Sequence, residues 1–375
     1  MTPMELSDRL NPVLDVARSS ASKVDAEACF PAEAVSELRA SGLLGLTLPT
    51  DVGGLGQGPH EFVEVVSAIA EACGSTAMIY LMHSAAAMTV AAAPPAGHPD
   101  LLPSLAFGQA LGTLAFSEPG SRSHFWAPVS KAATSDGGGV RLDARKSWVT
   151  SAGQADVYVV STQSAEQDGI DLYAVPSDAA GVAVTGDWQG MGLRGNASNP
   201  MTFTSEADAG QRVGAVGGGF DLMMQAVLPW FNLGNAAVSL GLSRAAADAA
   251  VRHTSGAELE HLSQSLAALP TIRAQLARMS LDVAGTAAYV DKAAARLVEP
   301  ADDTMLHVLG VKALANDAAL RVTDTAMRVC GGAAFSAHLQ IDRMFRDARA
   351  GSVMAPTADV LYDFYGKAIT GQPLF

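Results

Sequence analysis

Hydrophobic residues recur every three or four positions from the start of the chain to about residue 111, which is the period of an amphipathic helix. Leu10, Val13, Leu14 and Ala17 follow this period. Further helices are expected over residues 32–41, 61–71 and 76–92, and a proline pair at 94 and 95 ends the last of them. Residues 1–111 therefore read as an N-terminal helical domain.

The pattern changes at about Gly112. Up to about residue 205, short apolar runs are separated by Gly, Asp, Ser and Pro, as in 140–142, 157–160, 172–175 and 182–184. This spacing is typical of strands joined by turns. Residues 112–212 are expected to form a compact β-domain of six to eight strands.

The helical period returns near Phe220 and continues to the end of the chain. Four long segments stand out, at about 219–254, 258–297, 303–329 and 356–368. Pro229 should kink the first segment and free the carbonyl of Gln225, because proline has no N–H to donate. Residues 213–375 thus read as a C-terminal helical domain, and the fold class is α+β with helices on both sides of a β-domain.

Composition excludes several classes of function. The chain has 375 residues, with 24 basic and 38 acidic residues and a net charge of −14. Such a balance argues against nucleic acid or an anionic membrane surface as a partner. Its three cysteines are far apart and show no metal-binding spacing, so we expect no metal site and a reducing, cytoplasmic location. No signal peptide and no apolar run long enough to span a membrane is found.

The stretch from Leu114 to Trp126 is the first candidate for chemistry. It begins as an apolar strand, turns sharply at Pro119-Gly120, and then presents hydroxyls, a guanidinium and an imidazole beside Phe125 and Trp126. This set suits a planar, anionic ligand, although an ordinary polar turn after a strand is the alternative. A glycine-rich loop at 50–58 lacks dinucleotide-fingerprint spacing and is interpreted as a tight loop between helices.

Motifs in the β-domain and the C-terminal domain resemble those of the acyl-CoA dehydrogenase family. Ser117-Glu118-Pro119 resembles that family's T-E-P motif, and Trp148-Val149-Thr150 its W-[IV]-T motif. The turn at 190–195 and Arg346-Asp347-Ala348-Arg349 are similar to two further family motifs. The resemblance implies a helical domain, a middle β-barrel domain and a C-terminal four-helix bundle, assembled as a homotetramer. It also implies FAD as the cofactor, and an acyl thioester of coenzyme A or a carrier protein as the substrate.

The resemblance also implies roles for individual residues. Phe116 and Ser117 should approach the flavin's pyrimidine edge, Trp148 its dimethylbenzene side and Thr150 the region of N5. A core aromatic is the alternative interpretation of Trp148. The remaining residues implied to bind the cofactor are Ser123 near the pyrophosphate or the ligand's tail, Thr357 and Asp359 after the last motif, and Arg328, Gly331 and Gly332 at the adenosine end.

The chain departs from the family where a catalytic base is expected. Ala355, followed by Pro356, stands where most members carry glutamate, and Phe231-Asn232 stands at the site that a minority use. Desaturation needs a base that removes a weakly acidic proton from the substrate. Because both positions for this base lack a carboxylate, ordinary dehydrogenation is in doubt. His124 is the candidate acid or base, since its ordinary pKa of about 6.5 suits either role. Arg122, Trp230, Phe231, Met354 and Ala355 are the expected substrate contacts.

Three functions stay open on this evidence. The first is an oxygenase that uses O₂ and a separate flavin reductase or electron acceptor. The second is an acyl-CoA or acyl-carrier-protein dehydrogenase whose base is not identified. The third is a non-catalytic subunit that completes a partner's cofactor site. Arg122 and His124 could also simply contact phosphate or solvent.

Overall fold

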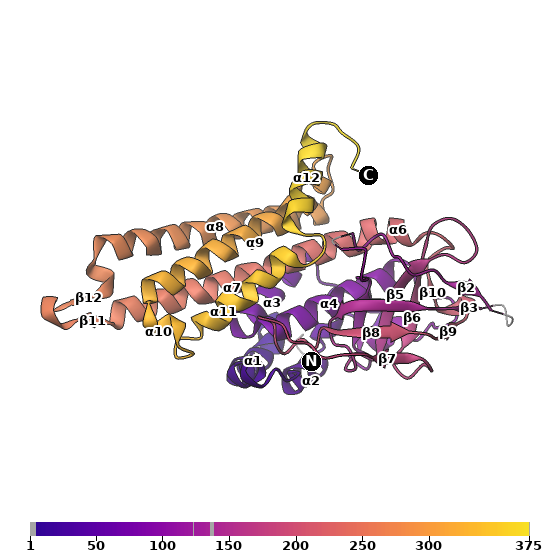
Figure 1. The fold of residues 1–375 in the computed structure, drawn as a ribbon, viewed down its shortest axis with the longest axis horizontal. Helices are drawn as coiled ribbons and strands as arrows, with labels where there is room; N and C mark the ends of the chain where they lie inside the picture. Colours follow the sequence, from indigo (N-terminus) through magenta and orange to yellow (C-terminus); the bar gives the residue numbers. More distant parts are fainter. Residues whose placement is uncertain (1–4, 123, 136–138, 375) are drawn as a thin grey trace.

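The computed structural model describes residues 5–122, 124–135 and 139–374. Three parts follow one another as expected: N-terminal helices, a β-domain and long C-terminal helices (Figure 1). The β-domain lies at one end of the elongated molecule, and the helices α7, α8 and α9 extend to the other end. No helix among the described residues is long and apolar enough to cross a membrane.

The N-terminal domain is built around α4, which is buried along nearly its whole length. Because α4 packs against β1 and α7, it is apolar on all sides rather than on one face. The glycine-rich loop at 50–58 is confirmed as a tight connection between helices, closed by Gly53 at φ 92°. The helices of this domain are α1 (Leu6–Glu27), α2 (Ala32–Ala40), α3 (Pro59–Ala72), α4 (Gly74–Ala92) and α5 (Leu101–Ala106).

The described residues of the β-domain form more strands than expected, because several are only two residues long. They are β1 (Gly112–Ala115), β2 (Ala133–Thr134), β3 (Val140–Arg141), β4 (Ala144–Val149), β5 (Val157–Gln163), β6 (Ile170–Pro176), β7 (Val182–Val184), β8 (Asn199–Phe203), β9 (Glu206–Ala207) and β10 (Arg212–Val213).

These strands form three sheets of order β1-β5-β6-β10, β4-β8-β7 and β2-β3-β9, so the expected barrel is open rather than continuously hydrogen-bonded. The pair β1–β5 is parallel and the other pairs are antiparallel. Strand β5 is buried on both faces. Val157 and Val159 belong to the main core with the helices, and Tyr158 and Val160 to a second core inside the β-domain. Burial on both faces explains why this strand is a continuous apolar run.

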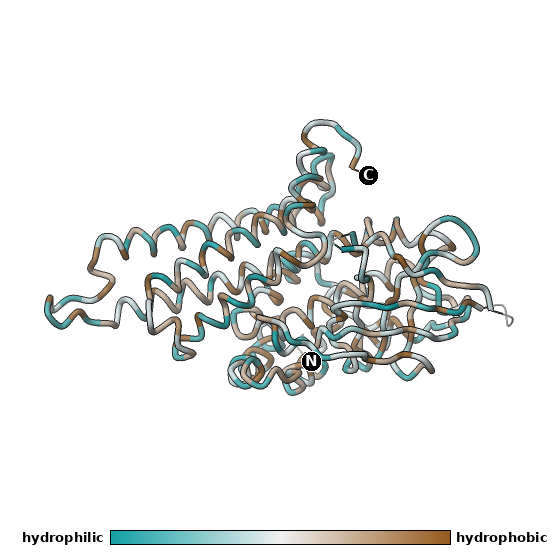
Figure 2. The backbone as a smooth tube through the Cα atoms, viewed as in Figure 1, coloured by the Kyte–Doolittle hydropathy of each residue, from teal (hydrophilic) through white to brown (hydrophobic). Residues whose placement is uncertain are grey.

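The C-terminal domain differs from expectation in two places. Residues 258–269 are not α-helical: β11 (Glu258–Leu259) and β12 (Gln264–Ser265) form a small hairpin, short 3₁₀ turns follow each of these strands, and α8 begins only at Pro270. A helix that we did not expect, α11, precedes the last one. The helices are α6 (Gly219–Leu222), α7 (Leu228–Gly256), α8 (Pro270–Val298), α9 (Thr304–Cys330), α10 (Gly332–Phe335), α11 (Ile341–Val353) and α12 (Ala358–Ile369). Figure 2 shows hydrophobic and hydrophilic positions alternating along the long helices.

The irregularity expected at Pro229 is present just before α7. Residues Met223–Val227 form a π-helical turn, and Pro229 follows within the first turn of α7. A proline is tolerated there because its missing N–H falls where the regular hydrogen-bond ladder is already interrupted.

Candidate functional site

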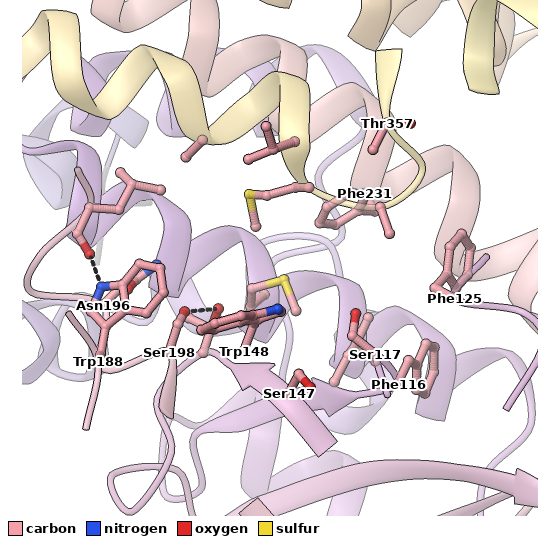
Figure 3. A pocket seen from close by; sticks show the side chains of 18 of the residues that line it. Phe116, Ser117, Phe125, Ser147, Trp148, Trp188, Asn196, Ser198, Phe231 and Thr357 are labelled. Carbon is pink, nitrogen blue, oxygen red and sulfur yellow. Dashed lines mark hydrogen bonds between the residues drawn. The ribbon is translucent and has the colours of Figure 1, made fainter. Parts of the chain in front are cut away.

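A cavity of about 950 Å³ lies where the β-domain meets α7 and the α11–α12 junction. Figure 3 shows its side chains converging from these elements. The turn after β1 contributes Phe116, Ser117 and Arg122, the end of β4 contributes Trp148, and the α11–α12 junction contributes Thr357. Residues distant in sequence are therefore assembled around one space large enough for a sizeable ligand.

A buried ion pair holds the turn that follows β1. Lys146 Nζ donates to Glu118 Oε1 (2.5 Å) and to the Ser161 carbonyl oxygen (2.6 Å), and both charged side chains are almost completely buried. Glu118 also accepts hydrogen bonds from the backbone N–H groups of Val129 and Ser130. Burial lowers the pKa of Lys146 to about 8. For Glu118, burial raises the pKa, but the charge and hydrogen bond of Lys146 together with the hydrogen bonds from Ser130 outweigh it, and the net shift is downward.

Trp148 is placed in the cavity by a bulge in β4. The pairing of β4 with β8 shifts register between Lys146 and Val149, and Trp148 adopts φ 55°. Its side chain is 65% exposed, which excludes the core-aromatic interpretation. The Trp148 ring meets the Trp188 ring edge-on, with centroids 5.7 Å apart. An indole face is thus available to a planar ligand.

Hydroxyl and amide groups lie beside Trp148. Thr150 is buried, and its Oγ1 lies 3.2 Å from the Oγ of Ser198. Figure 3 shows Ser198 beside Trp148. Asn196 is also buried and lines the cavity, and its Oδ1 has no partner within the described protein. A buried amide oxygen without a partner is costly, so it suits a ligand that brings an N–H or O–H donor.

The opposite wall supplies no acid. Val353, Met354 and Ala355 line it, and Phe231 contributes from α7. Asn232 points elsewhere, because its Nδ2 donates to the Val308 carbonyl oxygen (2.9 Å). Among the lining residues that the structure describes, the one carboxylate is Glu118, which is bound to Lys146. The two family base positions therefore carry no group that can take a proton.

Polar contacts brace α11 against the other two domains. Arg346 donates to both carboxylate oxygens of Asp25 in α1, at 2.8 and 2.6 Å. The Leu193 N–H donates to Asp347 Oδ1 (2.6 Å). Asp347 is buried, and burial raises its pKa to about 6. The wall of the cavity formed by α11 is thus fixed by contacts that cross the domain boundaries.

The structure brings together most, but not all, of the residues predicted from sequence. Those that line the cavity are Phe116, Ser117, Arg122, Trp148, Thr150, Phe231, Met354, Ala355 and Thr357. Those that do not line it are His124, Trp230, Arg328, Gly331, Gly332 and Asp359. Ser123 lies outside the described residues.

The expectation that His124 borders the cavity is wrong for this structure. Its side chain is exposed, and its ring lies beside Trp126 with centroids 5.1 Å apart. The reason is local: Arg122 has φ 49°, and the His124 N–H donates back to the Ser121 carbonyl oxygen, so the chain turns away after Arg122. Its role as acid or base stays a prediction.

The other predicted residues that do not line the cavity lie elsewhere in the C-terminal domain. Trp230 packs edge-on against Phe62 in the helical core, 5.2 Å between centroids. Arg328, Gly331 and Gly332 are exposed at the end of α9, next to α10 and far from the β-domain (Figure 1). Asp359 is exposed in the first turn of α12. Within one chain, the end of α9 does not reach this cavity.

Sequence reasoning missed several lining residues. Ser147, Trp188, Asn196, Ser198 and Arg349 all face the cavity. Trp188 and Asn196 flank the turn at 190–195, so their proximity to a recognised motif was the available signal. Among the described residues, no group of three His, Cys, Asp or Glu side chains is arranged to hold a metal ion.

Comparisons with known proteins agree with this architecture. Three family models match in order: the acyl-CoA dehydrogenase N-terminal domain over residues 13–109, the middle domain over 113–205 and the C-terminal domain over 217–370. "Probable acyl-CoA dehydrogenase YngJ" of Bacillus subtilis is 27% identical over 352 residues, covering 91% of this chain and 90% of the relative.

Solved structures show the same fold. Butyryl-CoA dehydrogenase of Megasphaera elsdenii superposes with a TM-score of 0.89 at 22% identity, covering 98% of this chain and all of the other. A structure described as the FAD complex of PigA also superposes with a TM-score of 0.89, at 16% identity, covering 97% of each chain. Since the family models together span most of the chain, it belongs to the acyl-CoA dehydrogenase family.

Proposed function

We propose that this protein is an FAD-dependent oxidoreductase that acts on an acyl thioester of coenzyme A or of a carrier protein, and that it oxygenates this substrate with O₂. The observation that carries the oxygenase assignment is the absence of a free carboxylate from the described lining of the cavity. Dehydrogenation needs such a base close to the substrate's α-carbon, because the α-proton must be removed. A reduced flavin, in contrast, reacts with O₂ without a protein carboxylate.

The cavity fits FAD in its chemistry. The exposed face of Trp148 suits a planar ring system, and Thr150, Ser198 and the unpartnered Asn196 Oδ1 supply polar contacts beside it. When bound, FAD supplies two-electron redox chemistry and, once reduced, reactivity toward O₂. The protein's own residues bind and orient the ring through the turn after β1 and the bulge in β4.

The substrate side is apolar. Phe231, Val353, Met354 and Ala355 would surround the acyl group and exclude water, while Arg122 and Arg349 offer positive charge to an anionic part of the ligand. A separate flavin reductase or another electron donor would supply the electrons. The acyl group itself is not specified by these contacts.

Dehydrogenation is the second candidate, because the matched relative from Bacillus subtilis and the Megasphaera elsdenii neighbour are named as dehydrogenases. A single experiment separates the two. FAD-loaded protein is mixed anaerobically with saturated acyl-CoAs of four to sixteen carbons, and flavin absorbance is followed. If the protein is an oxygenase, the flavin absorbance should not bleach under these anaerobic conditions. When O₂ labelled with ¹⁸O and a flavin reductase are then supplied, ¹⁸O should appear in the product. Rapid bleaching without O₂ would establish the dehydrogenase.

The third candidate, a non-catalytic subunit, makes a different prediction. Protein purified without colour, and unable to take up added FAD, would support it and would count against both enzymatic functions. Release of FMN rather than FAD from heat-denatured protein, identified by mass, would contradict the cofactor assignment alone.

We also propose a homotetramer. An exposed stripe of small and apolar residues runs along α8 with alternating spacings of three and four, formed by Ala274, Ala277, Leu281, Ala284 and Ala288. Leu281 is 72% exposed, and a side chain added at Gly285 would meet nothing within 4 Å. This is the spacing of a helix-packing seam, and none of the residues that the structure describes covers it, so a second copy can do so.

A further inference from the structure

Lys312 is a buried cation without a carboxylate partner. It lies in the middle of α9, its residue is 0% exposed, and no carboxylate of the described residues lies within ion-pair distance of its Nζ. Burying an ammonium group is costly unless its hydrogen bonds are satisfied. The surroundings of Lys312 must therefore supply hydrogen-bond acceptors for its ammonium group. The location of these acceptors indicates which part of the structure the side chain holds.

All three acceptors belong to one short segment of backbone. Lys312 Nζ donates to the carbonyl oxygens of Gly351 (2.8 Å), Met354 (3.0 Å) and Pro356 (2.8 Å). An ammonium group has three N–H donors, so every donor is used, and each bond goes to the stretch that leaves α11 and enters α12. We call residues 351–356 the junction segment.

Neighbouring polar side chains support the same segment. Asn316, one turn further along α9, lies so close to Gly351 that a Cβ there would come within 2.4 Å of Asn316 Oδ1. Ser239 Oγ donates to that oxygen (2.7 Å), and Asn235 Nδ2 approaches Met354 Sδ at 3.8 Å. The junction segment thus rests on a polar platform formed by α7 and α9, in an otherwise apolar core.

The junction segment is also a wall of the cavity. Val353, Met354 and Ala355 line it, and Thr357 follows at once. The carbonyls held by Lys312 flank Ala355, the position that most family members use for a base. Fixing carbonyls on both sides of Ala355 fixes the direction of the side chains between them.

We propose that Lys312 is a positioning residue that holds the junction segment in place and thereby shapes the part of the cavity that receives the acyl group. The effect on the segment is independent of the proposed function, whereas the effect on ligand affinity rests on it. A purely packing role for Lys312 would instead be filled by an apolar side chain of similar length.

The test removes the three N–H donors of Lys312 while keeping the volume of the side chain nearly unchanged. K312M is compared with the wild type and with T323V, which removes a buried hydroxyl of α9 that bonds only within its own helix. Amide hydrogen exchange of FAD-loaded protein is followed by mass spectrometry, and butyryl-CoA is the probe for affinity. We expect exchange in residues 351–357 to rise at least tenfold in K312M, and the Kd for butyryl-CoA to rise by a similar factor, with neither change in T323V.

Unchanged exchange over 351–357 in K312M, or the same rise in T323V, would overturn the proposal. Because exchange is measured without substrate, failure of the wild type to bind butyryl-CoA would count against the proposed function and leave the exchange result decisive. If K312M does not fold, K312Q keeps two amide donors and is measured in the same way. Failure of both variants to fold would also overturn the proposal, since Lys312 would then govern folding as a whole.

Discussion

The Glu118–Lys146 pair is the residue-scale feature on which the flavin side of the cavity depends. Glu118 fixes the turn that carries Phe116 and Ser117, and Lys146 begins the bulge that presents Trp148. Breaking a buried pair leaves an uncompensated charge, whereas replacing both partners does not. The pair is therefore better described as a device for positioning than as a source of net stability.

We expect E118Q to lower the free energy of unfolding by about 3–5 kcal/mol, because it leaves Lys146 buried without a counter-charge. Denaturant unfolding measures this, and E206Q, at an exposed glutamate of β9, serves as the control. The double variant E118Q/K146M should recover part of the loss. A double variant as unstable as E118Q would contradict this interpretation.

Asp347 gives stability a defined dependence on pH. Burial raises its pKa to about 6, so in the folded protein it holds a proton that the unfolded chain releases at about pH 4. Stabilisation from this group is present below about pH 4 and is lost as the pH rises through 6. D347N imitates the protonated form, so the stability of the wild type relative to this variant should fall between pH 4 and 7. A difference that stays constant with pH would contradict the assignment.

His124 can be tested directly because the structure places it outside the cavity. We expect H124N to keep FAD and to leave kcat within about twofold of the wild type, since an exposed side chain beside Trp126 does not reach the ligand. Steady-state kinetics with an acyl-CoA that the wild type turns over measures this. A loss of kcat of about 100-fold would restore His124 as an acid or base.

At the scale of elements, the π-helical turn before α7 adapts the helix to Pro229. Val227 and Phe231, on either side of this proline, both line the cavity. We expect P229A to stabilise the fold by less than the about 3 kcal/mol that a proline costs in a helix interior, because Pro229 lies within the first turn of α7, and to change the affinity for acyl-CoA. Thermal unfolding and binding assays measure the two effects. A less stable variant would show that the π turn does not arise from Pro229.

Elements were predictable from sequence where one periodicity persisted. The helices α1 and α9 were expected because their apolar positions repeat over many turns. Helix α11 was not, because Ile341–Val353 is short and rich in charged residues that pair with other domains, as Arg346 does with Asp25. The resemblance predicted that Trp148 faces the cofactor, but the bulge that exposes its side chain was beyond prediction, because no local pattern shows where a strand changes register.

The resemblance of short motifs located the cofactor side of the site but not its whole wall. Residues inside motifs, such as Ser117 and Thr150, line the cavity. Trp188 and Lys312 lie outside the motifs quoted, and tertiary contacts that no local pattern encodes decide their surroundings. The same limit applies to His124, which adjoins a motif but is turned away by the backbone.

At the scale of the molecule, the exposed stripe on α8 predicts assembly. L281E should convert the proposed tetramer of four 38.5-kDa chains into smaller species, because a charge would be buried at the seam. Light scattering measures the mass. S280E, an exposed position beside the stripe, should leave the assembly intact. A wild-type mass of one chain would contradict the assembly itself.

The exposed indole of Trp148, next to Trp188, gives the protein an optical signal of its own. Both rings are at the cavity, and they are two of the four tryptophans in the chain. A flavin bound against them would accept their excitation energy, so their emission should be quenched as the cofactor enters. Titration of FAD followed by tryptophan emission, with W148F as the reference, would therefore report occupancy without any turnover.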